Sequence, residues 1–464
     1  MVEVICEKID EKKSSKDVSK AKDFPQVRAM MTAAIAMVSA GTLFTWPSPS
    51  VPKLQEAPYN FTIEELSYLT VIPPIAMVIF SPIYCWLLDN FSRKYTLFSS
   101  GFFHIASWIL IYFADDIWIF YGSRFVCGIA DACCFASMPA YIAEVATPRI
   151  RGLYGNAMMV LMFIGQFLIN CIGYYTSIKT TALCMMVFPI TFLFLFASMP
   201  ESPYFCIMKG REEDARKSLQ RLRGIENVDV EYEQIFKDVS RQMTETTRYV
   251  DLWSIKSNRK AVIIANLARA FQQFSGISAL MVYSQYIFNL SGGNISGGHA
   301  AMLFNGILAF INLFANVISD GLGRKKSMIF SCIGCGLGLL GESIYFYFNE
   351  YTNVDTEVAS WFPVVGLIIY IIIFTFGLGI VPTLLLGELF NTSIRGKAAL
   401  VTNCLFAIQL CGISKLFQIL MTGFGLTVPF FFFTVCCFLG GIASYFVIPE
   451  TKGKTLEQIQ QMLK

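Results

Sequence analysis

Long apolar stretches alternate with short polar ones along almost the whole chain. Runs of about 20 apolar residues are long enough to cross a bilayer as helices. Lipid offers no hydrogen-bond partners to the backbone, so helices are the natural way to cross it. The pattern therefore predicts an all-α membrane protein with about twelve transmembrane helices. Their approximate ranges are 27–47, 67–88, 95–114, 117–143, 153–175, 181–199, 260–288, 300–319, 327–348, 360–387, 398–421 and 427–448.

One long hydrophilic segment, residues 200–259, divides these spans into two sets of six. The predicted organisation is a cytosolic N-terminal tail (1–26), a six-helix bundle (27–199), a cytosolic bridge (200–259), a second six-helix bundle (260–448) and a cytosolic C-terminal tail (449–464). The bridge opens with Pro200-Glu201-Ser202 and is rich in charge. The two bundles are expected to be copies of one unit.

Composition supports a membrane protein and argues against an enzyme. The 464 residues are 55% hydrophobic and only 15% charged, less charge than a soluble protein carries. Most cysteines lie inside apolar runs, where they act as small apolar residues. The two histidines, His104 and His299, are far apart, and the sequence contains no glycine-rich phosphate loop and no metal-spaced Cys/His set. We expect no catalytic residues, no cofactor, no metal and no nucleic-acid partner.

The distribution of Lys and Arg predicts which loops face the cytosol. Loops that hold Arg93, Arg151 and Arg324 are basic, whereas the opposite loops are rich in acids. With an even number of spans, both termini are expected in the cytosol and the chain in the cell membrane. The sequon Asn60-Phe61-Thr62 then lies in the first outside loop, so Asn60 is a predicted glycosylation site.

Three short patterns occur once in each half, in the same order. They indicate a parallel duplication of a six-span unit. The paired residues are Asp89 and Arg93 with Asp320 and Arg324, Glu144 and Arg151 with Glu388 and Arg395, and Glu201 with Glu450. The bases alone would anchor the cytosolic loops. Acids at fixed spacing favour a cytosolic gate of ion pairs that form in one state and break in another.

The seventh span carries a polar stripe. At 100° per residue, Asn266, Arg269, Gln272, Gln273, Gly276, Tyr283 and Ser284 fall within about a third of the helix circumference. An amide in hydrocarbon needs a partner. It also offers donors and acceptors to hydroxyl groups. The stripe is consistent with a binding site in a wet cavity and equally with contacts between helices.

Asp131 and Arg269 lie near the middle of the fourth and seventh spans. A charge inside a membrane is costly and usually marks function. One hypothesis is that the two residues form a charge pair when a central cavity closes. The alternative is that cavity water hydrates each one separately.

Several motifs resemble those of the sugar porter family of the major facilitator superfamily, over about residues 27–460. They include Pro139–Glu144 with Arg151-Gly152, Pro200–Pro203, Gln272–Ile277 and Pro449–Gly453. Within the family, Gly41–Leu54 looks like the insect facilitated trehalose transporters and their relatives. The resemblance implies two six-helix bundles, a sugar site between them, alternating access and short helices in the bridge.

The resemblance also implies roles for individual residues. Gln272 and Gln273 match the family's sugar-binding glutamines. Ser278, Tyr283 and Thr383 are candidate substrate-binding residues, although Ser278 and Thr383 replace the family's asparagine and tryptophan. Proton-coupled members carry an acid in the first span, and residues 27–47 contain none. The prediction is facilitated transport of a sugar such as trehalose or a hexose, with the bilayer and the sugar as partners. A proton-coupled symporter, a carrier of another solute and a sugar sensor stay open.

Overall fold

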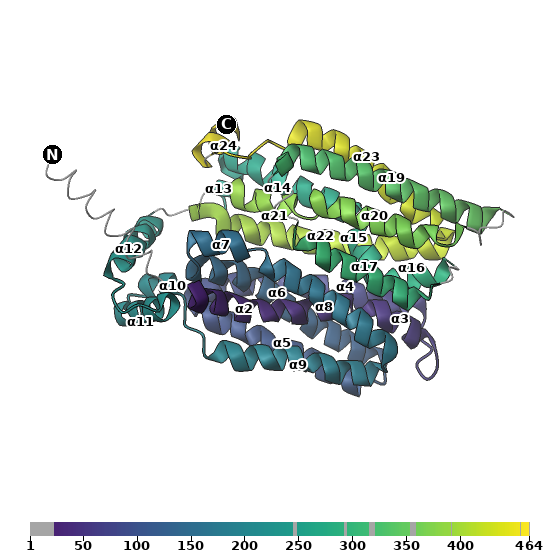
Figure 1. Ribbon diagram of the computed structural model, residues 1–464, viewed down its shortest axis with the longest axis horizontal. Coiled ribbons are helices and arrows are strands. Elements are labelled where there is room, and N and C mark those ends of the chain that lie inside the picture. Colours follow the sequence, from purple (N-terminus) through teal and green to yellow (C-terminus); the bar gives the residue numbers. More distant parts are fainter. Residues whose placement is uncertain are drawn as a thin grey trace.

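The computed structural model describes residues 23–244, 248–291, 295–314, 321–352, 359–390, 392–454 and 456–463. The described residues form helices joined by short connections, and most of the helices lie along the long axis of the molecule (Figure 1). Asp320, one of the predicted gate residues, lies outside the described residues.

The first bundle is formed by the helices that precede the bridge. Trp46, Trp108 and Phe120 are fully buried near one end of this bundle, and Tyr141 and Phe192 are fully buried near the other. The helices are α2 (Asp23–Thr45), α3 (Pro47–Gln55), α4 (Ile63–Asn90), α5 (Arg93–Phe113), α6 (Ile117–Val145), α7 (Pro148–Tyr154), α8 (Ala157–Tyr175) and α9 (Ile178–Ala197).

The bridge folds into short helices, as the resemblance implied. They are α10 (Pro203–Met208), α11 (Glu212–Arg223), α12 (Asp229–Thr244) and α13 (Asp251–Ser254). Helix α11 has a charged outer face, on which Arg216 lies 3.0 Å from Glu212, four residues earlier. Its inner face packs Ala215 and Leu219 against Tyr232 of α12. Since the apolar face of α11 packs on α12 and its charged face stays exposed, the bridge is a small helical unit with its own core.

The second bundle follows the bridge and has one continuous buried core, which includes Phe304, Tyr370 and Phe433. Its helices are α14 (Lys256–Phe274), α15 (Ile277–Val282), α16 (Ser284–Leu290), α17 (Gly297–Asn312), α19 (Arg324–Tyr351), α20 (Phe362–Phe376), α21 (Val381–Glu388), α22 (Thr392–Phe424) and α23 (Thr427–Val447). A short helix, α24 (Leu456–Leu463), follows.

Among the described residues, ten helical segments are long and apolar enough to cross a membrane. Helices α14–α16 cover the seventh predicted span and α17 covers the eighth. The seventh span is interrupted at Gly276, whose φ of 85° is left-handed. A Cβ atom there would also lie 2.4 Å from the Phe433 ring, so the break requires glycine. The all-α membrane fold predicted from the sequence is confirmed.

The two ends of the molecule differ. Helices α10–α12, the start of α2 and helix α24 lie at one end, which we call the bridge end (Figure 1). Helices α3 and α16 lie at the opposite, far end (Figure 1). An even number of crossings between α2 and α24 explains why both lie at the bridge end.

Candidate functional site

Gln272 and Gln273 end helix α14, immediately before the break at Gly276. The amide nitrogen of Gln272 donates to the carbonyl oxygens of Leu378, at 2.8 Å, and Gly379, at 3.2 Å. These carbonyls lie between α20 and α21, where the tenth span is interrupted. In an unbroken helix these carbonyls would accept hydrogen bonds from backbone N–H groups, and here they accept from Gln272 instead. Gln272 therefore links the breaks of the seventh and tenth spans.

Gln273 contacts the residue that follows the break. The Ser278 hydroxyl donates to Gln273 Oε1 at 2.6 Å. Both residues are buried, whereas Gln273 Nε2 makes no hydrogen bond to any described residue. A donor left over on a buried amide is available to a hydroxyl group of a ligand.

The other two candidate residues lie apart from this pair. Tyr283 is fully buried, with its ring centroid 5.4 Å from that of Phe417. Its hydroxyl has no partner among the described residues. Thr383 is partly buried on α21 and forms no hydrogen bond with either glutamine. The structure thus brings Ser278 to Gln273, whereas Tyr283 and Thr383 form no hydrogen bond with the glutamines.

Sequence reasoning missed a second polar cluster, which joins the bundles near the far end. The Ser48 hydroxyl donates to Asn170 Oδ1 at 2.8 Å and lies 2.8 Å from the Ser284 hydroxyl. One turn before Asn170, the buried Gln166 has an amide oxygen with no partner among the described residues. The amides of Gln166 and Asn170 within an apolar span were the signal in the sequence for this cluster.

Asp131 and Arg269 form no ion pair in this structure. Asp131 lies 3.8 Å from His104 Nε2 of α5 and accepts from the Cys127 thiol at 3.6 Å, within the first bundle. Arg269 Nη1 donates to Gln272 Oε1 at 3.1 Å, and its guanidinium lies over the Phe406 ring of α22. Their pairing in another state stays a prediction.

The first copy of the duplicated charges forms a cluster around Glu144. Arg93 Nε lies 3.2 Å from Glu144 Oε1, and Arg93 Nη1 lies 3.0 Å from Asp89 Oδ1. The Ser202 hydroxyl donates to the other Glu144 oxygen. Glu201 accepts from the Ser92 hydroxyl and, at 2.9 Å, from the backbone N–H of Lys94. The bridge is thus tied to the first turn of α5 and the last turn of α6.

The second copy repeats this arrangement. Arg324 Nη2 lies 2.8 Å from Glu388 Oε1, and the Thr451 hydroxyl donates to the other Glu388 oxygen. Glu450 accepts from the backbone N–H groups of Arg324, at 3.0 Å, and Lys325, at 3.2 Å. Burial alone would raise the pKa of Glu450, but these N–H donors and the Arg324 charge hold it below its ordinary value.

The other described gate residues, Arg151 and Arg395, meet no carboxylate of the described residues. Arg151 donates to the carbonyl of Ala143 at 3.3 Å, and Arg395 donates to that of Phe390 at 3.1 Å. The described residues form no ion pair across the two bundles, and each of their ion pairs stays within one bundle or the bridge. Arg93 with Glu144 and Arg324 with Glu388 thus pair in two separate clusters, one in each bundle, and the role of these charges as a gate stays a prediction.

Most hydrogen bonds between the bundles occur at the far end, whereas one, from the Asn156 amide before α8 to the Asn312 carbonyl of α17 at 3.0 Å, lies toward the bridge end. Tyr175 of α8 lies 2.8 Å from His299 of α17, and Tyr174 donates to Ser296 at 3.2 Å. Lys415 of α22 donates to Ser67 of α4 at 2.8 Å. Together with Ser48 and Ser284, these contacts hold the far ends of the two bundles together.

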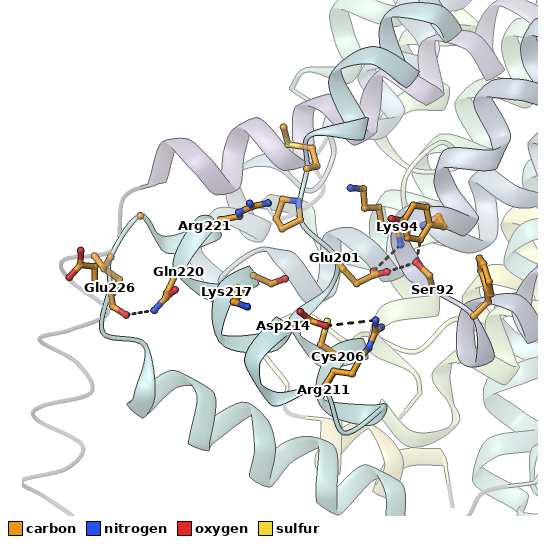
Figure 2. A pocket seen from close by; sticks show the side chains of 17 residues that line it. Ser92, Lys94, Glu201, Cys206, Arg211, Asp214, Lys217, Gln220, Arg221 and Glu226 are labelled. Atoms are coloured by element: carbon orange, nitrogen blue, oxygen red, sulfur yellow. Dashed lines mark hydrogen bonds and ion pairs between the residues drawn. The ribbon is translucent and has the colours of Figure 1, made fainter.

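A cleft of about 830 Å³ lies between the bridge and the start of α5. Figure 2 shows Glu201 beside Ser92 and Lys94 on one side of it, and Arg211 with Asp214 on another. Its lining mixes acids and bases and contains neither Gln272 nor Gln273. The cleft is therefore separate from the candidate substrate site.

A family model described as sugar (and other) transporter matches residues 28–463. The chain belongs to this family. It is a transporter by family and fold, and not an enzyme. The predicted resemblance to sugar porters is thereby confirmed.

Relatives in this sugar transporter family include two insect proteins. The chain is 30% identical to the facilitated trehalose transporter Tret1 of Polypedilum vanderplanki, over 95% of this chain and 88% of that protein. It is 29% identical to the Tret1 of Bombyx mori, over 94% of this chain and 86% of that protein. Both alignments run across the two bundles and the bridge.

Solved structures of sugar transporters share the fold. A proton:xylose symporter, XylE, bound to 6-bromo-6-deoxy-D-glucose superposes with a TM-score of 0.77, over 95% of this chain and 99% of that chain, at 20% identity. XylE of E. coli in an inward-open conformation gives the same TM-score at 19% identity, over 94% and 99% of the two chains. At this identity the likeness establishes the architecture alone.

Proposed function

We propose that this chain moves a sugar across the cell membrane by facilitated, uncoupled transport. Trehalose and hexoses are the first candidates, because the similar insect proteins are facilitated trehalose transporters. The observation that carries the proposal is the amide pair beside the broken seventh span. Gln273 keeps a free amide donor within a buried environment, next to Ser278, and sugars offer hydroxyl groups to such donors.

The proposed cycle moves residues 27–199 and 260–448 as two units around that site, with 200–259 as the bridge and 1–26 and 449–464 as tails. The far-end hydrogen bonds, such as the one between Ser48 and Ser284, support a state closed at the far end. With the bridge end in the cytosol, this is the state from which sugar exchanges with the cytosol. Asn60, exposed between α3 and α4, then faces outside and is the proposed glycosylation site.

The gate residues have a proposed role within each bundle. Arg93 with Glu144, and Arg324 with Glu388, each hold together the bridge ends of helices that must move as one body. Arg151 and Arg395 lie at the bridge end, close enough for their charges to interact. Two like charges favour separation, so this pair is proposed to promote opening of the bridge end.

Replacing Gln273 with Leu tests the site. The variant removes the free amide donor and the acceptor of the Ser278 hydroxyl at nearly constant volume. Loss of hydrogen bonds to a hydroxylated substrate is expected to lower sugar uptake about 10- to 100-fold at a subsaturating concentration. Uptake of radiolabelled trehalose and glucose into oocytes, corrected for surface expression, measures it. Gln220→Leu on the exposed face of α11 is the control, and equal uptake by the two variants would refute the site.

Uncoupled transport predicts that uptake does not depend on a proton gradient. The first span, 27–47, contains no Asp or Glu to carry a proton. In proteoliposomes, sugar entry is expected to proceed at the same initial rate with and without an imposed pH gradient and to stop at equal concentrations. Accumulation above the outside concentration, abolished by a protonophore, would instead establish a symporter.

A further inference from the structure

Arg269 occupies an unusual position beside the proposed sugar site. It lies on α14 one turn before Gln272, and it is partly buried in the body of the second bundle. Its guanidinium donates once, from Nη1 to Gln272 Oε1 at 3.1 Å. Nε is fully buried without a partner, and Nη2 bonds to no described residue. Arginine does not lose its proton in proteins, so a full positive charge stands here with most of its donors unused.

No carboxylate among the described residues forms an ion pair with Arg269. Within the spans, Asp131 contacts His104 and Cys127 in the first bundle. Glu342 is fully buried on α19, beside Gly366 of α20, and Glu388 pairs with Arg324. The contact that Arg269 does make with a ring, over Phe406 at 5.1 Å, offsets only part of the cost of burying a cation.

The other cations in the spans differ from Arg269. Arg124 is buried, but it donates to the carbonyls of Leu69, at 2.8 Å, and Leu43, at 2.7 Å. Lys415 donates to the Ser67 hydroxyl and lies over the Tyr68 ring. Arg269 is thus the cation that combines an unsatisfied buried donor with direct contact to a candidate substrate-binding side chain.

We infer that Arg269 binds the carboxylate of a sugar acid, so that the site prefers a sugar with one negative charge over its neutral counterpart. This inference rests on the proposed function, since Gln273 holds the hydroxyl groups of the same substrate. A guanidinium matches a carboxylate with two parallel N–H donors, and the Nε and Nη2 nitrogens, which have no partner among the described residues, lie side by side on it. A single base suits a monoanion better than a phosphate ester, which carries nearly two charges.

The test compares glucose with glucuronate, which have the same ring and differ in the carboxylate at C6. Binding to the purified full-length chain is measured by calorimetry. The wild type is expected to bind glucuronate about 10- to 100-fold more tightly than glucose, the range for a charged hydrogen-bond pair. Arg269→Gln is expected to abolish this preference, and Arg269→Lys, which keeps the charge, is expected to retain part of it.

Matched variants and a second readout separate the possible outcomes. Arg149→Gln changes an exposed arginine at the bridge end and is expected to leave the preference for glucuronate intact. Gln273→Leu is expected to lower the affinity for glucose and for glucuronate by the same factor. In proteoliposomes, entry of glucuronate carries one negative charge per molecule and is electrogenic, whereas glucose entry is not. A wild type that binds glucose as well as or better than glucuronate overturns the inference and leaves the proposed function intact. Binding of neither ligand overturns the inference, and if trehalose is not taken up either, it overturns the proposed function as well.

Discussion

Replacing Arg93 with Met is expected to destabilise the protein by about 3 kcal/mol, because the buried Glu144 then loses its counter-charge. The two side chains are 9% and 18% exposed, and they lie 3.2 Å apart. Ser202 still donates to Glu144 in the variant, so the loss is expected at the low end of the 3–5 kcal/mol range for breaking a buried pair. Thermal unfolding in detergent, followed by tryptophan fluorescence, measures the loss.

The double variant Arg93→Met/Glu144→Leu is the informative companion. Removing both charges leaves no buried ion, so most of the lost stability is expected to return. Arg324→Met and Arg324→Met/Glu388→Leu should repeat the pattern in the second bundle, where the pair is 2.8 Å long. Double variants that are less stable than either single variant would show that these residues do not act as pairs.

These variants also distinguish two roles for the duplicated clusters. A gate of ion pairs between the bundles would be released by Arg93→Met, and transport would change while stability stayed constant. The observed pairs lie within each bundle, and Ser202 and Thr451 join each Glu to the segment that follows its bundle. If the pairs instead hold each bundle rigid, Arg93→Met lowers stability and transport together, and the double variant restores both.

The sequence predicted the fold because hydrophobic length is a robust signal in membranes. Equal spacing in two copies implies equal geometry, and Arg93 with Glu144 and Arg324 with Glu388 do form pairs at equivalent places of the two bundles. The sequence did not predict which partners they meet, because Glu144 can reach Arg93 of its own bundle only after α5 and α6 have packed. The bridge helix α11 was foreseeable from the i,i+4 spacing of Glu212 and Arg216.

The candidate site was less predictable than the fold. Periodicity placed Arg269 and Gln272 on one stripe, but it assumed a straight helix through the seventh span. The chain turns at Gly276, which changes the direction of every later residue, including Tyr283. The carbonyls that Gln272 meets come from a second break, at Leu378 and Gly379. Contacts between two helix breaks depend on tertiary structure, so a helical wheel cannot show them.

Replacing Gly41 or Gly165 with Ala is expected to destabilise the first bundle by about 3 kcal/mol, at the high end of the cost of overpacking. Both glycines lie where α2 packs against α8, each against the backbone of the other helix. A Cβ at Gly41 would lie 2.0 Å from the Met162 carbonyl oxygen, and a Cβ at Gly165 would lie 2.3 Å from that of Val38. Both obstacles are backbone atoms, so a side-chain rotation cannot relieve them and the helices must separate. The midpoint of thermal unfolding of the purified variants in detergent measures this effect.

Gly122→Ala on α6 is the matched control, because a Cβ there would meet nothing within 4 Å. Alanine favours the helix over glycine by about 1 kcal/mol, so this variant is expected to be as stable as the wild type or slightly more stable. The double variant Gly41→Ala/Gly165→Ala should cost less than the sum of its parts, since the first methyl group already separates the helices. Small residues allow the close backbone approach that holds helices together in a membrane. If the losses of the two single variants simply add in the double variant, the two glycines act at independent contacts.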